Sequence, residues 1–208
     1  PDLSVYEMVA AYSTFANKGV YNKPSFIEKI EDKNGTILFQ SNPEIKDVLS
    51  EEVAYITVNL LEGVTTAGSG TRLRTVGADE YNRAYQKVVT GYPYEFKNPI
   101  AGKTGTTQNQ SDGWFIGMVP NLVTGVWVGA EDRAIHFEDI AYGQGATMAL
   151  PIWANYMRNI YVDTTLMISK EPFEKPDNLN IELDCNKFVI DRIGSGKTTD
   201  QEIQDIDF

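Results

Sequence analysis

Two apolar runs near the middle of the chain, residues 112–120 and 122–129, constrain its fold most. Each is rich in aromatic and β-branched residues, and a Pro-Asn pair joins them. Runs of this kind bounded by turn residues are typical of β-strands, and so short a connection favours antiparallel pairing. The sequence therefore predicts a β-hairpin here.

The tripeptide Lys103-Thr104-Gly105 precedes this hairpin, within the run AGKTGTTQNQSDGWFIG. Lysine supplies positive charge, and threonine hydroxyls bond carboxylate or phosphate oxygens. Glycine lets a ligand approach the backbone closely. The pattern predicts an anion site beside a strand.

A phosphate-binding loop is the first alternative for this anion site, and it needs a glycine five residues before its Gly-Lys-Ser/Thr end. Lys97 occupies that position before Gly102-Lys103-Thr104. Asp191 occupies it before the second candidate, Gly196-Lys197-Thr198. Neither run fits a nest of backbone amides around phosphate, and the second is better interpreted as a polar tail.

The second alternative is the lysine-threonine-glycine motif of serine enzymes that act on penicillins and on the peptides that penicillins mimic. From Ser4 to about Tyr161 the chain resembles the transpeptidase domain of class A, bifunctional penicillin-binding proteins. Four blocks carry the resemblance in the family's order: SVYEMVAAYSTFANKGVYNKP, SEEVAYITVNLLEGVTTAGSGTRLR, AGKTGTTQNQSDGWFIGMVPNLVTGVWVGAED and GQGATMALPIWANYM.

The resemblance implies an α+β fold like that of β-lactamases and transpeptidases, an antiparallel sheet with flanking helices, present here only in part. It implies a D,D-transpeptidase that acts on peptidoglycan stem peptides and is acylated by β-lactams, without metal or cofactor. Lys103 and Thr106 are the expected catalytic residues, Thr106 through its backbone N–H in the oxyanion hole. Thr104, Gly105 and Thr107 are the expected substrate-binding residues, with the Thr104 and Thr106 hydroxyls on the substrate carboxylate.

The sequence differs from the family's pattern in that both serine motifs, serine-x-x-lysine and serine-x-asparagine, are missing. No serine in this sequence has lysine three positions on or asparagine two positions on. We therefore expect the chain to be the C-terminal part of a longer protein whose N-terminal half holds the nucleophile and any membrane anchor, at the extracytoplasmic face of the inner membrane. The alternatives are a non-catalytic penicillin-binding-like scaffold, or a serine β-lactamase or D,D-carboxypeptidase.

Other catalytic groups are poorer candidates. A Ser-His-Asp triad would need the single histidine, His136. Ser69 lies in a near match to the Gly-x-Ser-x-Gly elbow, but Ala67 replaces the first glycine, so residues 65–74 are expected to form a polar loop near the active-site rim. Cys185 is the only cysteine, which excludes an internal disulfide. The acidic pairs at 131–132 and 138–139 are expected to be solvated rather than metal-binding.

Charge restricts the partners. Eighteen Lys plus Arg against 29 Asp plus Glu give a formal net charge of −11, which repels nucleic acids and anionic lipid surfaces. No apolar run in the sequence approaches the length of a membrane span. We expect no nucleic-acid partner.

Apolar spacing predicts the surrounding elements. One helix starts at Val5 and stops at Lys18-Gly19, and a second follows Ser50. A hairpin turns at Asn34-Gly35 within residues 25–39. A third helix is expected over residues 148–161, covering the sheet. We expect the aromatic residues Tyr92, Tyr94 and Phe96 to pack in the core; the alternative is that they line a groove beside Lys103.

The chain is expected to divide into a transpeptidase portion, residues 1–162, and a C-terminal extension, residues 163–208, where proline, lysine, aspartate and asparagine become frequent. Since the resemblance implies that two strands of the family sheet lie outside this sequence, the strand near Val126 should have a free edge. An unpaired edge favours pairing with another copy or with the missing N-terminal half.

Overall fold

The structure is a computed structural model in which residues 3–74, 89, 91–184 and 187 are described. The chain divides into two compact units, residues 1–176 and 177–208. The helices and strands given below lie in the first unit. The boundary predicted after residue 162 concerns the extent of a family domain, which this division does not test.

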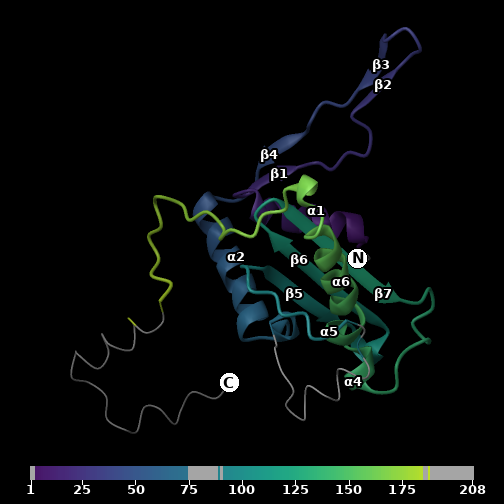
Figure 1. Ribbon diagram of the computed structural model, residues 1–208, viewed down its shortest axis with the longest axis vertical. Helices are drawn as coiled ribbons and strands as arrows, with labels where there is room; N and C mark the ends of the chain where they lie inside the picture. Colours follow the sequence, from purple (N-terminus) through teal and green to yellow (C-terminus); the bar gives the residue numbers. More distant parts are fainter. Residues whose placement is uncertain (1–2, 75–88, 90, 185–186, 188–208) are drawn as a thin grey trace. The chain divides into compact units, whose positions relative to one another are not determined.

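A three-stranded antiparallel sheet forms the centre of the first unit, in the order β5-β6-β7 (Figure 1). Its strands are β5 (Ala101–Thr106), β6 (Asp112–Val119) and β7 (Leu122–Gly129). Val119 pairs with Leu122, so only Pro120 and Asn121 make the turn between β6 and β7. The predicted hairpin is confirmed, with its first strand ending at Val119.

Helices cover both faces of this sheet. A Cβ added at Gly125 would meet Val9 of α1 (Val5–Ala16), which places α1 on one face. A Cβ added at Gly117, on the other face, would meet the Trp153 ring of α6 (Leu150–Ile160). α2 (Glu51–Thr66) packs with α1, and α5 (Gly145–Met148) precedes α6. The predicted α+β fold, an antiparallel sheet with flanking helices, is confirmed.

The helix ends follow from side-chain caps. The Ser4 hydroxyl accepts from Glu7 N at 3.2 Å while the Glu7 carboxylate accepts from Ser4 N at 2.8 Å, which is a capping box. The Ser50 hydroxyl accepts from Val53 N at 3.3 Å and starts α2 as predicted. α1 ends where Lys18 and Gly19 turn to φ values of 55° and 90°. Left-handed backbone of this kind cannot continue a helix.

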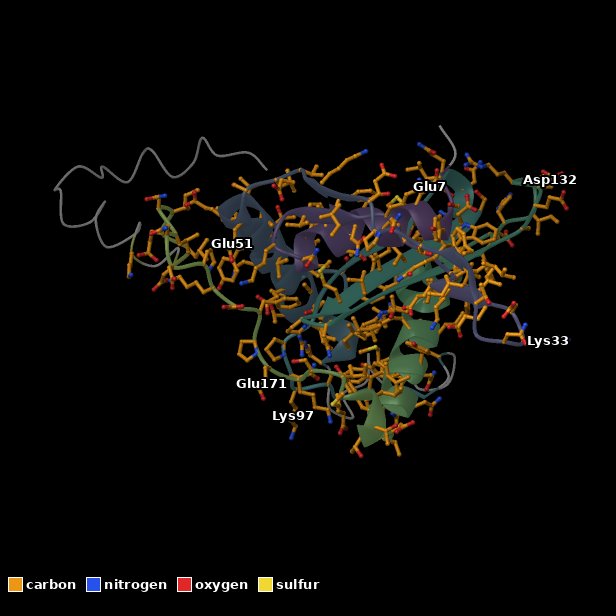
Figure 2. All side chains as sticks on the ribbon, turned by 90° about the horizontal axis from the view of Figure 1, so that it is seen from above. Glu7, Lys33, Glu51, Lys97, Asp132 and Glu171 are labelled. Atoms are coloured by element: carbon orange, nitrogen blue, oxygen red, sulfur yellow. The ribbon has the colours of Figure 1, made fainter. Side chains whose placement is uncertain are left out.

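Two further strand pairs follow α1. β1 (Val20–Asn22) pairs with β4 (Ile45–Asp47), and β2 (Lys29–Glu31) pairs with β3 (Ile37–Gln40). The turn between β2 and β3 contains Gly35 at φ +83°, which confirms the predicted Asn-Gly hairpin. Every residue of β2 and β3 is exposed, and Figure 2 shows Lys33 of the turn pointing into open space.

The main core lies between the sheet and α6. Tyr92, Tyr94 and Phe96 are buried there, so the predicted packing role is confirmed. The prediction of a polar loop over residues 65–74 is wrong in part. Thr65 is buried in the last turn of α2, and Leu73 is fully buried in a short 3₁₀ helix, η1 (Thr71–Leu73). The spacing of apolar residues alone did not distinguish the end of α2 and the short helix after it from a solvated loop.

The remaining short elements are η2 (Gln108–Gln110), α4 (Ile140–Gly143) and η3 (Thr164–Leu166). The acidic pairs Glu131-Asp132 and Glu138-Asp139 are exposed, as predicted. Asp132 projects from the edge of the molecule in Figure 2. Within the described residues, every helix is too short or too polar to cross a lipid bilayer.

Candidate active site

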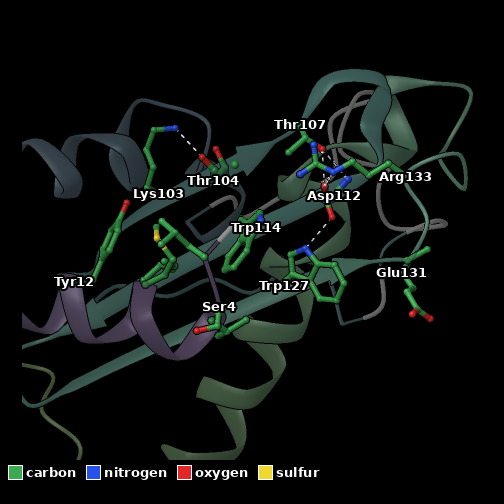
Figure 3. A pocket seen from close by; sticks show the side chains of 16 residues that line it. Ser4, Tyr12, Lys103, Thr104, Thr107, Asp112, Trp114, Trp127, Glu131 and Arg133 are labelled. Carbon is green, nitrogen blue, oxygen red and sulfur yellow. Dashed lines mark hydrogen bonds and ion pairs between the residues drawn. The ribbon is translucent and has the colours of Figure 1, made fainter. Parts of the chain in front are cut away.

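A groove of 690 Å³ runs between α1 and the face of the sheet that α1 covers. Four of the five predicted site residues line it, namely Lys103, Thr104, Gly105 and Thr107. The sheet contributes aromatic and aliphatic walls, and the start of α1 and the loop after β7 complete the lining with Leu3, Ser4, Val5, Met8, Tyr12, Asp112, Trp114, Ile116, Trp127, Ala130, Glu131 and Arg133. Figure 3 shows Trp114 between Lys103 and Trp127 along this groove.

Lys103 places a positive charge at the rim of the groove. Its side chain is exposed, and its Nζ donates to the Thr104 carbonyl at 2.8 Å. Tyr12 of α1 faces the same groove, and burial raises the pKa of its hydroxyl, which therefore stays protonated at neutral pH. The groove thus has the Lys103 cation and the neutral Tyr12 phenol among its lining residues.

The edge of β5 that faces away from β6 has no strand partner among the described residues. Thr107 N donates to Asp112 O at 3.1 Å, which directs this N–H toward β6. Backbone groups alternate in direction along a strand, so the N–H of Thr106 points the opposite way. Among the described residues β5 pairs only with β6, and the Thr106 N–H therefore faces an unpaired edge.

The hydroxyls of Thr104 and Thr106 have protein partners in this structure. The Thr104 Oγ1 lies 2.5 Å from Ser69 Oγ. The Thr106 Oγ1 accepts from Gly145 N at 3.0 Å, and Thr106 is absent from the groove lining. Thr106 therefore presents its N–H to the open edge of β5, while its hydroxyl fixes the start of α5.

Gly105 and Thr107 occupy sites with little spare room. A Cβ added at Gly105 would lie 3.1 Å from the Trp114 Cβ, so a larger residue would press on that indole. The Thr107 Oγ1 lies 3.0 Å from Asp112 Oδ2 and accepts from Asp112 N at 3.0 Å. Thr107 is therefore tied to the first residue of β6, although it also lines the groove.

Asp112 is a site residue that the sequence patterns missed. Its carboxylate is buried, and its Oδ1 accepts from Trp127 Nε1 at 3.0 Å (Figure 3). The Arg133 Nε, in the loop after β7, lies 3.8 Å from the Asp112 Oδ2. The signal in the sequence was an acidic residue opening an otherwise apolar strand, where burial forces a carboxylate to find donors.

The other sequence candidates do not converge on the groove. His136 is exposed, and its Nδ1 lies 3.0 Å from the carbonyl of the next residue, Phe137. Ser69, by contrast, lies beside Thr104, at the rim where the sequence placed its loop. Cys185 and the 193–199 run lie outside the described residues. The described residues hold no group of three His, Cys, Asp or Glu side chains suited to a metal ion.

The sequence model of the family described as "Penicillin binding protein transpeptidase domain" matches residues 2–158. The chain belongs to this family. The resemblance predicted from the four sequence blocks is thereby confirmed, and the groove at Lys103 lies within the matched segment.

Known proteins similar to the chain are penicillin-binding proteins 1A. That of Aquifex aeolicus is 33% identical over 190 residues, which are 91% of this chain and 22% of that protein. That of Clostridium acetobutylicum is 31% identical over 159 residues, 76% of this chain and 17% of that protein. The chain thus spans about a fifth of the length of these relatives.

Solved structures agree on the fold. Penicillin-binding protein 1A from Haemophilus influenzae superposes with a TM-score of 0.62 at 25% identity, over 86% of this chain and 28% of that one. Penicillin-binding protein A from Mycobacterium tuberculosis, in an imipenem acyl-enzyme complex, gives a TM-score of 0.51 at 18% identity, over 75% of this chain and 31% of that one. The second likeness concerns the fold alone.

Proposed function

We propose that this chain forms one wall of the active site of a peptidoglycan D,D-transpeptidase. The observation that carries the proposal is the edge of β5 that has no strand partner among the described residues, where the Thr106 N–H points outward and the Lys103 ammonium donates to the carbonyl of Thr104, two residues earlier. An unpaired N–H next to a cation is what an acyl-transfer site needs for a developing oxyanion and a substrate carboxylate.

In the proposed reaction a serine Oγ attacks the carbonyl of the D-alanyl-D-alanine bond of a stem peptide. The oxygen that becomes negative accepts from the Thr106 N–H, and the terminal carboxylate lies near Lys103 and Thr104. The C–N bond breaks, and D-alanine leaves with the proton taken from the serine, which stays acylated. An amine of a second stem then attacks the acyl-serine ester, the ester C–O bond breaks, and the amine proton returns to the serine Oγ. A β-lactam acylates the same serine through opening of its ring.

The nucleophile in this proposal comes from polypeptide other than these 208 residues, because no serine in the sequence has lysine three positions on. The groove along α1 is the place where such a segment would meet Lys103. On this proposal the protein works at the extracytoplasmic face of the membrane, where stem peptides are found.

Labelling with fluorescent penicillin tests the proposal on two samples, this chain and the complete product of the gene that encodes it. We expect covalent labelling of the complete product and none of the chain alone. Lys103→Ala should slow labelling by about 100-fold, because it removes the cation that pairs with the penicillin carboxylate, and a charge-assisted contact contributes about 1.5–3 kcal/mol. Lys33→Ala, at the exposed hairpin turn, is the matched control and should label like wild type.

Full labelling of the Lys103→Ala variant would remove Lys103 from the site. Absence of labelling in the complete wild-type product, with its fold intact, would instead favour a scaffold in which the site has lost catalysis. Rapid labelling with rapid release of hydrolysed product would favour a serine β-lactamase.

A further inference from the structure

Ser69 is held beside the candidate site by the end of α2. Gly68 N and Gly70 N both donate to the Val64 carbonyl, at 3.2 and 2.9 Å. A Cβ added at Gly68 would lie 2.9 Å from the Val64 Cα, and one at Gly70 would lie 3.2 Å from the Val64 oxygen. The two glycines therefore let the chain fold tightly over the last turn of α2, with Ser69 between them.

The same loop is fixed to the sheet and to α5. Thr65 Oγ1 donates to the Ile100 carbonyl at 2.6 Å, one residue before β5 begins. On the other side of Ser69, Arg72 donates to Ala146 O at 2.9 Å and to Thr147 Oγ1 at 2.7 Å. The Ser69 side chain is exposed, yet its backbone has little freedom to move away from β5.

The contact between Ser69 and Thr104 restricts where the hydrogen of Thr104 can point. Their hydroxyl oxygens lie 2.5 Å apart, and either can be the donor. A hydroxyl has one hydrogen and two lone pairs. If Thr104 donates to Ser69, it has no hydrogen left for a substrate carboxylate, and if Ser69 donates, the hydrogen of Thr104 is free. A carboxylate at Thr104 selects the second arrangement.

We propose that Ser69 is a positioning residue, which donates its hydrogen to Thr104 so that the Thr104 hydroxyl donates to the carboxylate of the acyl donor. This proposal rests on the proposed function, because it assigns Thr104 to carboxylate binding. A hydroxyl that already accepts a hydrogen bond is a stronger donor, so the chain from Ser69 through Thr104 to the anion is cooperative. Ser69 does not touch the substrate in this arrangement.

The test measures the second-order rate of acylation of the complete gene product by benzylpenicillin. We expect Ser69→Ala to lower this rate about tenfold, because the variant weakens the hydrogen bond that Thr104 donates to the charged ligand. Ser69→Thr, which keeps the hydroxyl, should recover the rate to within about twofold of wild type. The matched control is Ser41→Ala, because Ser41 Oγ donates to another exposed hydroxyl, Ser25 Oγ, at 3.3 Å.

A double-mutant cycle separates positioning from direct binding and from a general effect on folding. If Ser69 acts through Thr104, the variant carrying both Ser69→Ala and Thr104→Val is as slow as Thr104→Val alone. Additive losses, or a wild-type rate for Ser69→Ala, overturn the proposal. The melting temperature of Ser69→Ala should match that of Ser41→Ala, since neither side chain is buried.

The two proposals fail in different ways. Wild-type protein that benzylpenicillin does not acylate overturns the proposed function and this inference together. Wild-type protein that is acylated, with a Ser69→Ala variant equally fast, overturns the role of Ser69 alone.

Discussion

Replacing Asp112 with alanine should destabilise the first unit by about 2 kcal/mol, because it removes the acceptor at the head of β6. The Asp112 side chain is buried and accepts from Trp127 Nε1 and Thr107 Oγ1, each at 3.0 Å. A hydrogen bond to a charged group contributes about 1.5–3 kcal/mol.

Two features of the site keep the expected loss of stability below the summed contributions of the two hydrogen bonds to Asp112. The indole of Trp127 is 40% exposed and can turn to water, and the Thr107 hydroxyl still has Ser111 Oγ at 3.0 Å. The ion pair with Arg133 adds little, because the two groups are 3.8 Å apart and the Arg133 side chain is largely exposed. In a unit of this size the loss corresponds to a fall in melting temperature of about 4–8 °C.

The measurement is urea unfolding of this chain, followed by tryptophan fluorescence and repeated by circular dichroism. Asp112→Asn keeps an acceptor for Trp127 and should lose about 1 kcal/mol. The matched control is Asp132→Ala, an exposed carboxylate that accepts from Ala134 N at 2.8 Å, and its expected loss is below about 0.5 kcal/mol. Equal unfolding midpoints for Asp112→Ala and Asp132→Ala would refute the account of the Asp112 carboxylate.

Two further predictions concern charge and the sheet edge. Burial raises the pKa of the Glu62 carboxyl above 4.5, and this effect outweighs the positive charge of Arg74, which lowers the pKa. The folded state therefore binds the carboxyl proton more tightly than the unfolded state does. Because of this difference, the folded state loses stability as the pH rises through the raised pKa. Glu62→Gln should therefore be more stable than wild type at pH 7 and equal to it near pH 4, by thermal unfolding; an equal gain at both pH values would contradict this. Among the described strands β7 pairs only with β6, so its other edge can pair with a second copy of the chain. Light scattering of the concentrated chain should therefore show weak self-association, which Thr124→Lys in β7 should reduce. A monomer at every concentration would count against pairing through this edge.

Sequence patterns formed by neighbouring residues predicted much of this fold. The β6–β7 hairpin, the Asn-Gly hairpin and the helix after Ser50 each depend on residues that are close in sequence, and each is present. A strand alternates its side chains and a helix repeats them every 3.6 residues, whatever lies on the other side. The lysine-threonine-glycine motif likewise placed the candidate site on a strand beside a hairpin.

Partners from distant segments were not predictable in the same way. The Thr106 hydroxyl bonds to Gly145, and Ser69 bonds to Thr104, across 39 and 35 residues of sequence. A sequence pattern shows that a hydroxyl is present, but only the packed chain shows whether another group of the protein has already bonded it. Asp112 was missed for this reason, since its donors come from β7 and from the turn before β6.

The alternation of β5 explains how so short a motif can serve several roles in the proposed reaction. Lys103 and Gly105 pair with Ile116 and Trp114 on the face of the sheet that borders the groove, whereas Thr106 pairs with Gly113 on the face that α5 covers. The N–H of Thr106 points in a third direction, along the sheet plane to the open edge. A strand thus separates the cation, the hydroxyl and the N–H by its own geometry, and a slip of one residue would exchange their faces. The bond of Thr107 to Asp112 fixes that register at the end of β5, so the Asp112 variants should disturb acylation of the complete protein as well as its stability.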